Sequence, residues 1–447
     1  MPEMFADLAP IDRFPTVDEM HDFAVRLAAA HPDRVRVRDV GRSRAGDPIQ
    51  LLSIRSDHAR GDVLVIGQPH PNEPIGMATI IAMCEGLLAE PAALDATGAS
   101  WHFVPCADPD GTRLNEGWFA GPWTREHYAR NFYRPAGDTQ VEWTFPFSTD
   151  GFTVDAPMPE TRALMLAIDE VRPAVMASLH NGELGGAYYY ATPGADALYR
   201  RLAELCAAHD IPLHLGDPET PLSVELAPAV YSVPTALQMY ELARSVGADP
   251  AAIVSGSSSM DYALQYGPTF GLAIELPYWR DERAADTTPD ASGASSRQVM
   301  LDALDLHAAS ATSLRALFDA AAPLPPSPFA DAVGSFLSSE ESGWGEGQRQ
   351  QVENDPGLDR PATVAEAFST RDNVHMFRLR LGGMLLRALP AESPARADVE
   401  RAFDEWCAEA AADHKAEPIP IRDLVAVQGE SILAAAAYAL SSKDGDG

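Results

Sequence analysis

The stretch Val63-Leu64-Val65-Ile66-Gly67-Gln68-Pro69-His70-Pro71-Asn72-Glu73-Pro74 decides the fold. Its first four residues form an apolar run that predicts a buried strand. Pro74 suits the first position of a helix, and apolar residues with helical spacing follow it: Met77, Ile80, Ile81, Cys84, Leu87 and Leu88. His70 and Glu73 therefore stand where a strand of an α/β sheet leads into a helix, the usual place for ligands in such folds.

The three-residue spacing of His70 and Glu73 lets an imidazole nitrogen and a carboxylate point at the same place. Such a pair supplies two of the three protein ligands of a catalytic zinc site, whose fourth position holds water. Taken alone, the same pair is more often a histidine that caps a turn and a glutamate that begins a helix. The zinc hypothesis therefore depends on further ligands elsewhere in the chain.

Composition excludes several classes of protein. The 447 residues carry a formal net charge of -32, from 65 acidic and 33 basic side chains. This excess argues against binding to nucleic acid or to an anionic membrane surface. The four cysteines form no CxxC pair and are expected to be reduced thiols of a cytoplasmic protein. We expect neither a secretion signal nor a transmembrane span.

The segment before the central strand predicts a helix and a hairpin. Apolar residues repeat with helical spacing between residues 16 and 30, and two alternating strands flank a turn that begins Gly41-Arg42-Ser43. A helix that ends in Ala-His-Pro-Asp, this hairpin and a strand that ends in HxxE resemble the opening of the zinc carboxypeptidase family (M14, the carboxypeptidase A-like metallopeptidases). The resemblance covers roughly residues 14–315. It implies an α/β fold, a mixed β-sheet flanked by helices.

A strong turn, Asp108-Pro109-Asp110-Gly111, follows the next predicted strand. It is similar to an Asn-Pro-Asp-Gly turn of the family, with Asp108 in the place of the asparagine. The resemblance implies that Arg113, shortly after the turn, stabilises the oxyanion. The alternative is an exposed arginine in a solvated loop.

The resemblance also assigns residues to the recognition of a carboxylate. Arg130 matches the arginine of the family's Asn-Arg pair, which binds the substrate's terminal carboxylate, because a guanidinium pairs bidentately with a carboxylate. Ala129 stands where the asparagine of that pair is expected. Asn131 and Arg134 are therefore alternatives for this role.

A third apolar strand ends at His180, which is 107 residues after Glu73. On its own, His180 would more often be a hydrogen-bonded histidine at the end of a strand. The resemblance implies instead that it is the third zinc ligand. We expect Asn181 to contact the substrate and Glu183 to be a pocket residue.

A carboxylate stands within a fourth apolar run, Gly271-Leu272-Ala273-Ile274-Glu275-Leu276. Burying such a group is costly unless it has a partner or a chemical role. The run resembles the family's Phe-Glu-Leu strand, which makes Glu275 the general acid and base; the alternative is a buried ion-pair partner. The resemblance places Met260 at the base of the specificity pocket, which favours an apolar or neutral side chain. It also places Ile253 where related proteins carry a mobile tyrosine, and no spacing identifies Tyr262 or Tyr266 as its replacement.

The character of the chain changes near residue 320. Pro323, Pro325, Pro326 and Pro328 favour extended backbone. We therefore predict a catalytic domain over residues 1–320, a Pro-rich linker over 321–330 and a helical C-terminal extension over 331–447. Within the extension, the polar segment 339–360 is predicted to be a loop.

These observations predict a zinc-dependent metallocarboxypeptidase with one Zn²⁺ per chain, held by His70, Glu73 and His180. Its substrate would be a peptide or an acyl amino acid with a free carboxylate. Two alternatives stay open: an N-acyl amino acid deacylase similar to aspartoacylase and succinylglutamate desuccinylase, and a non-catalytic zinc-binding module. The sequence leaves the oligomeric state undecided, with a homo-oligomer among the options.

Overall fold

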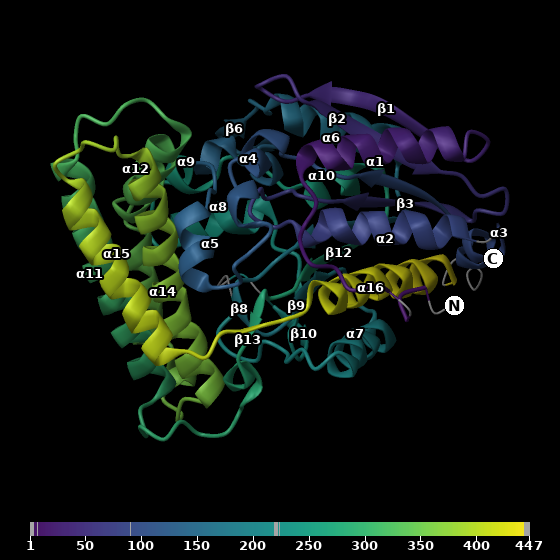
Figure 1. Cartoon of the computed structure of the whole chain (residues 1–447). Coiled ribbons are helices and arrows are strands. Elements are labelled where there is room, and N and C mark those ends of the chain that lie inside the picture. The colour runs from purple at the N-terminus through teal and green to yellow at the C-terminus, as the bar shows by residue number, and fades with distance from the viewer. Residues whose placement is uncertain (1–3, 7, 90, 219–221, 223, 442–447) are drawn as a thin grey trace.

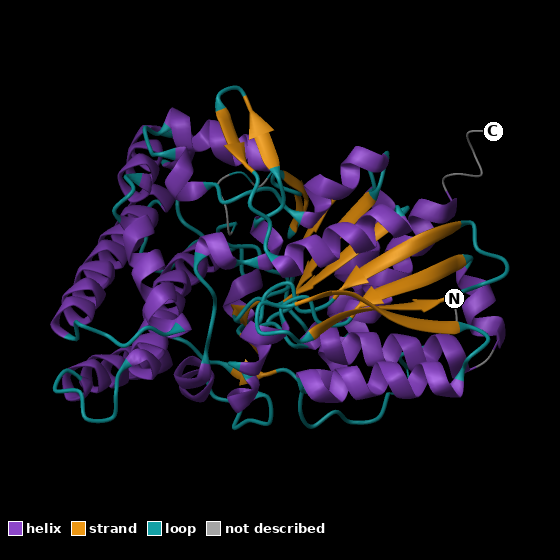
Figure 2. Ribbon diagram, turned by 90° about the horizontal axis from the view of Figure 1, so that it is seen from above, coloured by secondary structure: helices purple, strands orange, loops and turns teal. Residues whose placement is uncertain are grey.

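A mixed sheet of nine strands forms the centre of the protein (Figures 1 and 2). The computed structural model describes residues 1–447 apart from 1–3, 7, 90, 219–221, 223 and 442–447. In spatial order the strands are β1 (Val35–Arg42), β2 (Pro48–Ile54), β4 (Ala99–Val104), β3 (Gly61–Ile66), β7 (Val175–His180), β12 (Phe270–Glu275), β9 (Tyr188–Ala191), β11 (Val230–Ser232) and β10 (Glu225–Ala227). The hairpin predicted before the central strand is confirmed as the antiparallel pair β1 and β2.

The three central strands, β3, β7 and β12, run parallel to one another. Their carboxyl ends therefore meet at one edge of the sheet, where ligands bind in folds of this kind. The pairing of β7 with β12 places Glu275 directly beside His180. The sheet thus brings together two residues that are far apart in the sequence.

Helices cover both faces of the sheet (Figure 2). They include α1 (Val17–Ala30), α2 (Ile75–Ala89), α6 (Pro159–Val171), α7 (Asp196–Ala208) and α16 (Ile421–Ser441). The strands are apolar on both faces because each face has its own core. Val63 and Val65 of β3 pack in the core that contains α2 and α16, whereas Leu64 and Ile66 pack in the core that contains α6. The fold class predicted from the sequence is confirmed.

Five helices form a bundle beside the sheet, at the left of Figure 1. They are α11 (Ser296–Ala320), α12 (Pro328–Glu340), α13 (Trp344–Asn354), α14 (Val364–Ala388) and α15 (Arg396–Asp413). α14 is the central member and packs against α11, α12 and α15, and also against the short helix α5 (Arg125–Asn131).

The packing of two helices differs from the predicted division of the chain. α11 lies before the Pro-rich segment but packs in the bundle, and α16 lies at the end of the chain but packs against α2, α7 and strands β7 and β12. Among the described residues, α16 is long and apolar enough to cross a membrane, and 67% of its apolar window is buried in the fold. Its composition is that of a core helix that contacts apolar neighbours on several sides.

The prediction of a loop over residues 339–360 was wrong, because residues 344–354 form α13. This helix is polar, so its sequence has little of the apolar periodicity that indicates a helix. It is held by packing against α11 and by the burial of Val352. A hydrogen bond from Gln350 to Glu346, one turn earlier, adds to its stability.

The turn after β4 supports the loop that follows β3. Ala107 and Asp108 donate backbone hydrogen bonds to Gly67 and Gln68. The Asp108 side chain caps the short helix α4 (Pro109–Arg113) by accepting a hydrogen bond from the Gly111 N–H. Its other oxygen, Oδ2, is buried with no hydrogen-bond partner among the described residues. Burial raises the pKa of Asp108 to about 7, and the nearby Glu160 also raises it.

The Asp108→Asn variant should therefore be more stable than the wild type at neutral pH. An acid whose pKa is higher in the folded state than in the unfolded state costs stability as the pH rises from about 4 to about 7, because only the unfolded chain releases the proton freely. Asparagine keeps the capping oxygen and carries no charge. We expect a gain of about 2–4 kcal/mol above pH 7 that shrinks toward zero near pH 4, measured by urea unfolding across this range. An equal gain in stability at every pH would contradict the raised pKa of Asp108. The Asp138→Asn variant, at an exposed position, controls for the change in net charge.

Candidate metal centre

The loop between β3 and α2 holds His70 and Glu73 in a tight turn. Gln68 adopts a left-handed backbone conformation with φ of 53°, which is uncommon for a residue with a side chain. Its buried side chain donates hydrogen bonds to the Pro71 carbonyl and to Thr112, and these hold the turn in place. The Glu73 N–H donates to the His70 carbonyl, which closes the turn.

Three side chains from this turn and from the end of β7 meet at one point. The Nδ1 atom of His180 lies 3.0 Å from Glu73 Oε2 and 3.2 Å from the Nδ1 atom of His70. His70 Nδ1 lies 3.1 Å from the same Glu73 oxygen. All three side chains are buried. They form a group that could hold a metal ion, as the sequence predicted.

The donor set fits zinc. Two imidazole nitrogens and a carboxylate are typical zinc ligands, and a tetrahedral ion about 2.0–2.1 Å from each nitrogen requires ligand atoms about 3.3 Å apart. The two Nδ1 atoms face each other at nearly this separation. The Nε2 atom of His180 lies 2.8 Å from Ser178 Oγ, and this contact fixes the orientation of the ring.

The charges around the ligands favour a cation at this point. Burial lowers the pKa of His180, but Glu275 and Glu73 more than offset this and raise it to about 9. Burial and the positive charge of Arg134 lower the pKa of His70 to about 3. Burial opposes ionisation of Glu73, yet the histidines and Arg134 hold its pKa well below the usual value. A divalent ion would take the place of the proton that His180 carries in its absence.

Glu275 faces the same cavity. Its Oε1 atom lies 3.8 Å from His180 Nδ1, and its side chain is 11% exposed. The cavity has a volume of about 520 Å³ and is lined by all three ligands and by Glu275, Arg134, Asn181, Glu183 and Met260. Ile253, at the place of the expected tyrosine, also lines it. Tyr262 and Tyr266 instead donate hydrogen bonds to Asp169.

Asn181 has a structural role beside the ligands. Its Oδ1 atom accepts hydrogen bonds from the Ile75 N–H at the start of α2 and from the Tyr278 hydroxyl. It therefore ties the end of β7 to the helix that follows Glu73.

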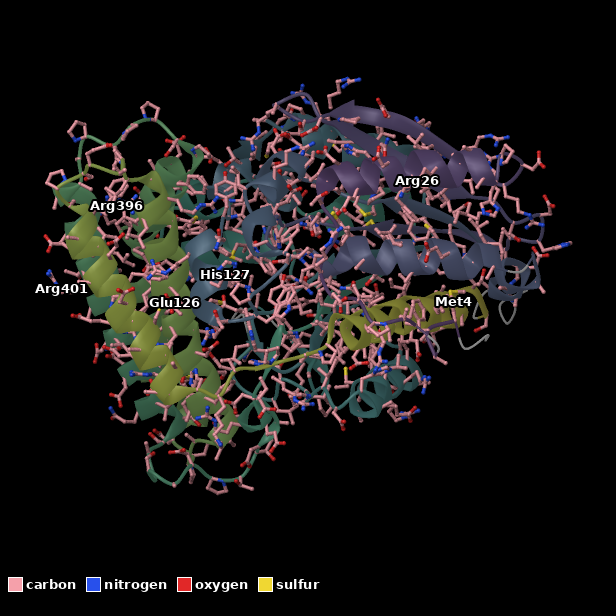
Figure 3. The ribbon with its side chains drawn as sticks, in the orientation of Figure 1. Met4, Arg26, Glu126, His127, Arg396 and Arg401 are labelled. Carbon is pink, nitrogen blue, oxygen red and sulfur yellow. The ribbon has the colours of Figure 1, made fainter. Side chains whose placement is uncertain are left out.

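Three residues predicted for the site lie elsewhere. Arg113 pairs with Asp18 and Asp47, and Arg130 pairs with Glu126 and Asp404 (Figure 3 labels Glu126). The Asn131 amide donates to the His127 carbonyl, within its own helix. None of the three lines the cavity that contains the metal ligands. Residues 125–131 form α5, and Arg130 in its last turn reaches Asp404 of α15 in the bundle.

Arg134 lies beside the metal ligands, as one of the sequence alternatives allowed. Its Nη1 atom donates to Glu73 Oε1 at 2.8 Å and to Asn72 Oδ1 at 3.3 Å. Its Nε atom donates to Gln140. These bonds hold a positive charge next to the metal centre.

Sequence reasoning missed the wall of the cavity that comes from the bundle. Four residues of α14 line the cavity: Asp372, Asn373, Met376 and Arg380. The Nε atom of Arg380 donates to Glu183 at 3.0 Å, and Arg125 donates to the other oxygen of Glu183. Charged side chains that interrupt the apolar pattern of α14 were a sequence signal that these positions have a special role. No short-range pattern, however, shows that α14 packs beside the metal ligands. Glu142, also buried at the cavity wall, had no sequence signal.

Two histidines and a glutamate at the carboxyl edge of a mixed sheet are a ligand set that suits zinc. The family model described as zinc carboxypeptidase matches residues 20–278, more than half of the chain. The chain therefore belongs to the zinc carboxypeptidase family, as the sequence motifs indicated.

Two curated relatives agree with this assignment. Zinc carboxypeptidase A 1 of Anopheles gambiae is 27% identical over 175 residues, which are 35% of this chain and 39% of the relative. Carboxypeptidase SOL1 of Arabidopsis thaliana is 26% identical over 207 residues, which are 42% of this chain and 38% of the relative. The matched part thus spans about two fifths of the length of each relative.

Two solved structures match part of the chain at low identity. Carboxypeptidase A from Helicoverpa armigera is 19% identical with a TM-score of 0.38, and the match covers 60% of this chain and 66% of that one. Bovine thrombin-activatable fibrinolysis inhibitor, in complex with tick carboxypeptidase inhibitor, is 12% identical with a TM-score of 0.40, and the match covers 61% and 88%.

Zinc should stabilise the metal-free protein through this ligand set. We expect excess Zn²⁺ to raise the melting temperature by roughly 5 °C, because an ion that binds only the folded state stabilises it by mass action. The His70→Ala variant should lose the gain. His102→Ala, which removes a buried histidine of β4 away from the centre, should keep it. Melting temperatures are measured by scanning calorimetry. An equal zinc-induced rise in the two variants would show that zinc binds away from His70.

Proposed function

We propose that the protein is a metallocarboxypeptidase that hydrolyses an amide bond next to a free carboxylate. One observation carries the proposal: in a member of the zinc carboxypeptidase family, two imidazole nitrogens and a carboxylate converge within about 3 Å, and a second carboxylate, Glu275, stands beside them in the same cavity. A zinc ion bound there would lower the pKa of a water molecule and polarise the substrate carbonyl.

Glu275 is the general base and general acid in this proposal. It lies at the edge of the centre, close to His180 but outside the group of three ligands. From this position it can accept a proton from the attacking water and deliver it to the departing amine. Because Glu275 is buried in the cavity wall, its carboxylate is held beside the metal centre, where the water and the amide bond would react.

Two other arginines take the roles that the resemblance implied for Arg113 and Arg130. Arg134, beside Glu73, stabilises the oxyanion. Arg380 binds the free carboxylate of the substrate. Its Nε atom is engaged by Glu183, whereas its two Nη groups make no hydrogen bond within the part of the chain that the structure describes. They can pair with a carboxylate in the cavity.

The comparisons favour a carboxypeptidase over the N-acyl amino acid deacylase, and the intact Glu275 argues against a non-catalytic zinc-binding module. We keep the cytoplasm as the proposed location, because all four cysteines are free thiols and three of them are buried. We also propose that the strongly acidic protein binds neither nucleic acid nor an anionic membrane. A homo-oligomer stays an open option.

The Glu275→Gln variant tests the assignment of the base. Glutamine has nearly the same shape but cannot accept the proton, so kcat should fall by about 10²–10⁴. Zinc content should stay at one ion per chain, measured by inductively coupled plasma mass spectrometry on the same sample. Full turnover in this variant would end the role of Glu275.

The Arg380→Met variant tests the recognition of the carboxylate. We expect kcat/KM for peptides with a free carboxylate to fall by about 10–100-fold, the cost of losing a charge-assisted hydrogen bond. The rate for the matching C-terminal amides should change little. Arg130→Met, which removes a guanidinium outside the cavity, is the control and should preserve the preference for the acid.

Loss of Arg380 also removes one partner of Glu183, so stability is measured alongside. An Arg380→Lys variant keeps the charge and should recover part of the acid preference. An unchanged ratio of acid to amide hydrolysis in Arg380→Met would show that another residue binds the carboxylate.

A further inference from the structure

A second cavity lies inside the C-terminal bundle. Its volume is about 770 Å³, and α11, α12, α13 and α14 form most of its walls. Apolar side chains line much of it, including Leu304, Leu337, Trp344 and Val374. Polar groups interrupt this surface, among them the side-chain amides of Gln348 and Gln351. Most of its lining residues lie beyond the family match over residues 20–278, and the proposed chemistry does not use this cavity.

The second cavity adjoins the catalytic one. Asp217 and Asn373 line both cavities. Asn373 is exposed on α14, and its two neighbours in sequence divide between the cavities: Asp372 lines the catalytic cavity and Val374 lines the second. The two spaces therefore lie on adjoining sides of α14 and meet at Asn373.

The boundary between the cavities is firmly built. The Asp217 N–H donates to Ser369 Oγ of α14 at 2.8 Å. Gly216 packs so closely on α14 that a Cβ atom there would lie 2.5 Å from the Ala365 carbonyl oxygen. The segment that carries Asp217 is thus attached to the helix that carries Asn373. A fixed contact between the sheet domain and the bundle therefore lies where the two cavities adjoin.

We propose that the two cavities form one substrate-binding groove, so that the substrate is an extended peptide. Its cleaved end lies at the metal centre, and its more distant residues pass Asn373 and occupy the cavity in the bundle. This inference rests on the proposed function and specifies its substrate class. A small N-acyl amino acid would end within the catalytic cavity and leave the second one unused.

The chemistry of the second cavity suits a peptide chain. Apolar walls can bury side chains, and the amides of Asn373, Gln348 and Gln351 can exchange hydrogen bonds with a peptide backbone. The cavity has more acidic than basic residues, since Asp217, Glu340, Glu341 and Glu346 face Arg315 and Arg349. Both arginines are already paired, Arg315 with Glu341 and Arg349 with Asp305. The groove should therefore prefer neutral or basic residues over acidic ones.

Two neighbouring alanines of α11 provide a matched test. Ala308 and Ala309 are both exposed, but Ala308 lines the second cavity and Ala309 does not. Ala308→Trp fills the cavity with a bulky ring, whereas Ala309→Trp adds the same ring outside it. Neither residue belongs to the catalytic machinery, so dipeptide hydrolysis should be the same in both variants and in the wild type.

The experiment measures kcat/KM of the zinc-loaded full-length protein for N-acetylated alanine-based peptides with free carboxylates, from dipeptide to hexapeptide. In the wild type and in Ala309→Trp, kcat/KM should rise about tenfold or more along the series, as each further buried side chain adds favourable contacts. In Ala308→Trp the rise should fall below about threefold. A wild-type rate independent of length, or the same rise in both tryptophan variants, would overturn the inference.

Binding separates this inference from the proposed function. The dissociation constants of the same peptides are measured by calorimetry with zinc-loaded Glu275→Gln protein, with and without the added Ala308→Trp change. If longer peptides bind more tightly and Ala308→Trp removes this gain in affinity, the groove is supported, even where the wild type hydrolyses none of the peptides. That absence of hydrolysis would refute only the proposed function. Hydrolysis of all peptides with length-independent binding would refute only the groove.

Discussion

The parallel pairing of β3, β7 and β12 is the constraint on which the site depends. Because the strands run in the same direction, each ends at the same edge of the sheet, and His180 and Glu275 become neighbours in register. The turn that follows β3 adds His70 and Glu73 at the same edge. Several ionisable groups are thereby buried together, which is stable only where opposite charges compensate one another. Arg134 provides part of that compensation, and a bound divalent cation would provide the rest.

The C-terminal residues complete this arrangement. On α16, the buried Gln428 accepts a hydrogen bond from Thr79 of α2 and donates one to the His180 carbonyl, so the last helix braces the end of β7. On α14, Arg380 pairs with Glu183, and Asp372 pairs with Arg125 and His414. The Arg380–Glu183 pair joins the bundle to the loop after β7, and the Arg125–Asp372 pair joins it to α5. The residues beyond the family match are therefore a structural part of the cavity that contains the metal ligands, and Figure 1 shows both helices close to the sheet domain.

Local patterns predicted the sheet, the hairpin and the ligand cluster because two apolar strands lead to the ligands: β3 runs into the turn that holds His70 and Glu73, and β7 ends at His180. The same patterns could not place the arginines. Arg113 and Arg130 are held by acids that are distant in sequence, such as Asp18 and Asp404, and only the folded chain brings those partners together. Arg380 reaches the site through the packing of α14, which no short-range signal records. The helix α13 was missed because a polar helix held by its neighbours lacks the apolar repeat on which the prediction relies.

His70, Glu73 and His180 should together bind a single zinc ion. X-ray absorption spectroscopy at the zinc edge, on protein loaded with one equivalent, can identify the atoms bound to that ion. We expect two imidazole nitrogens at about 2.0–2.1 Å, carboxylate oxygen at about 2.0–2.2 Å and no sulfur ligand. A zinc–sulfur distance of about 2.3 Å, or a spectrum without imidazole scattering, would contradict it.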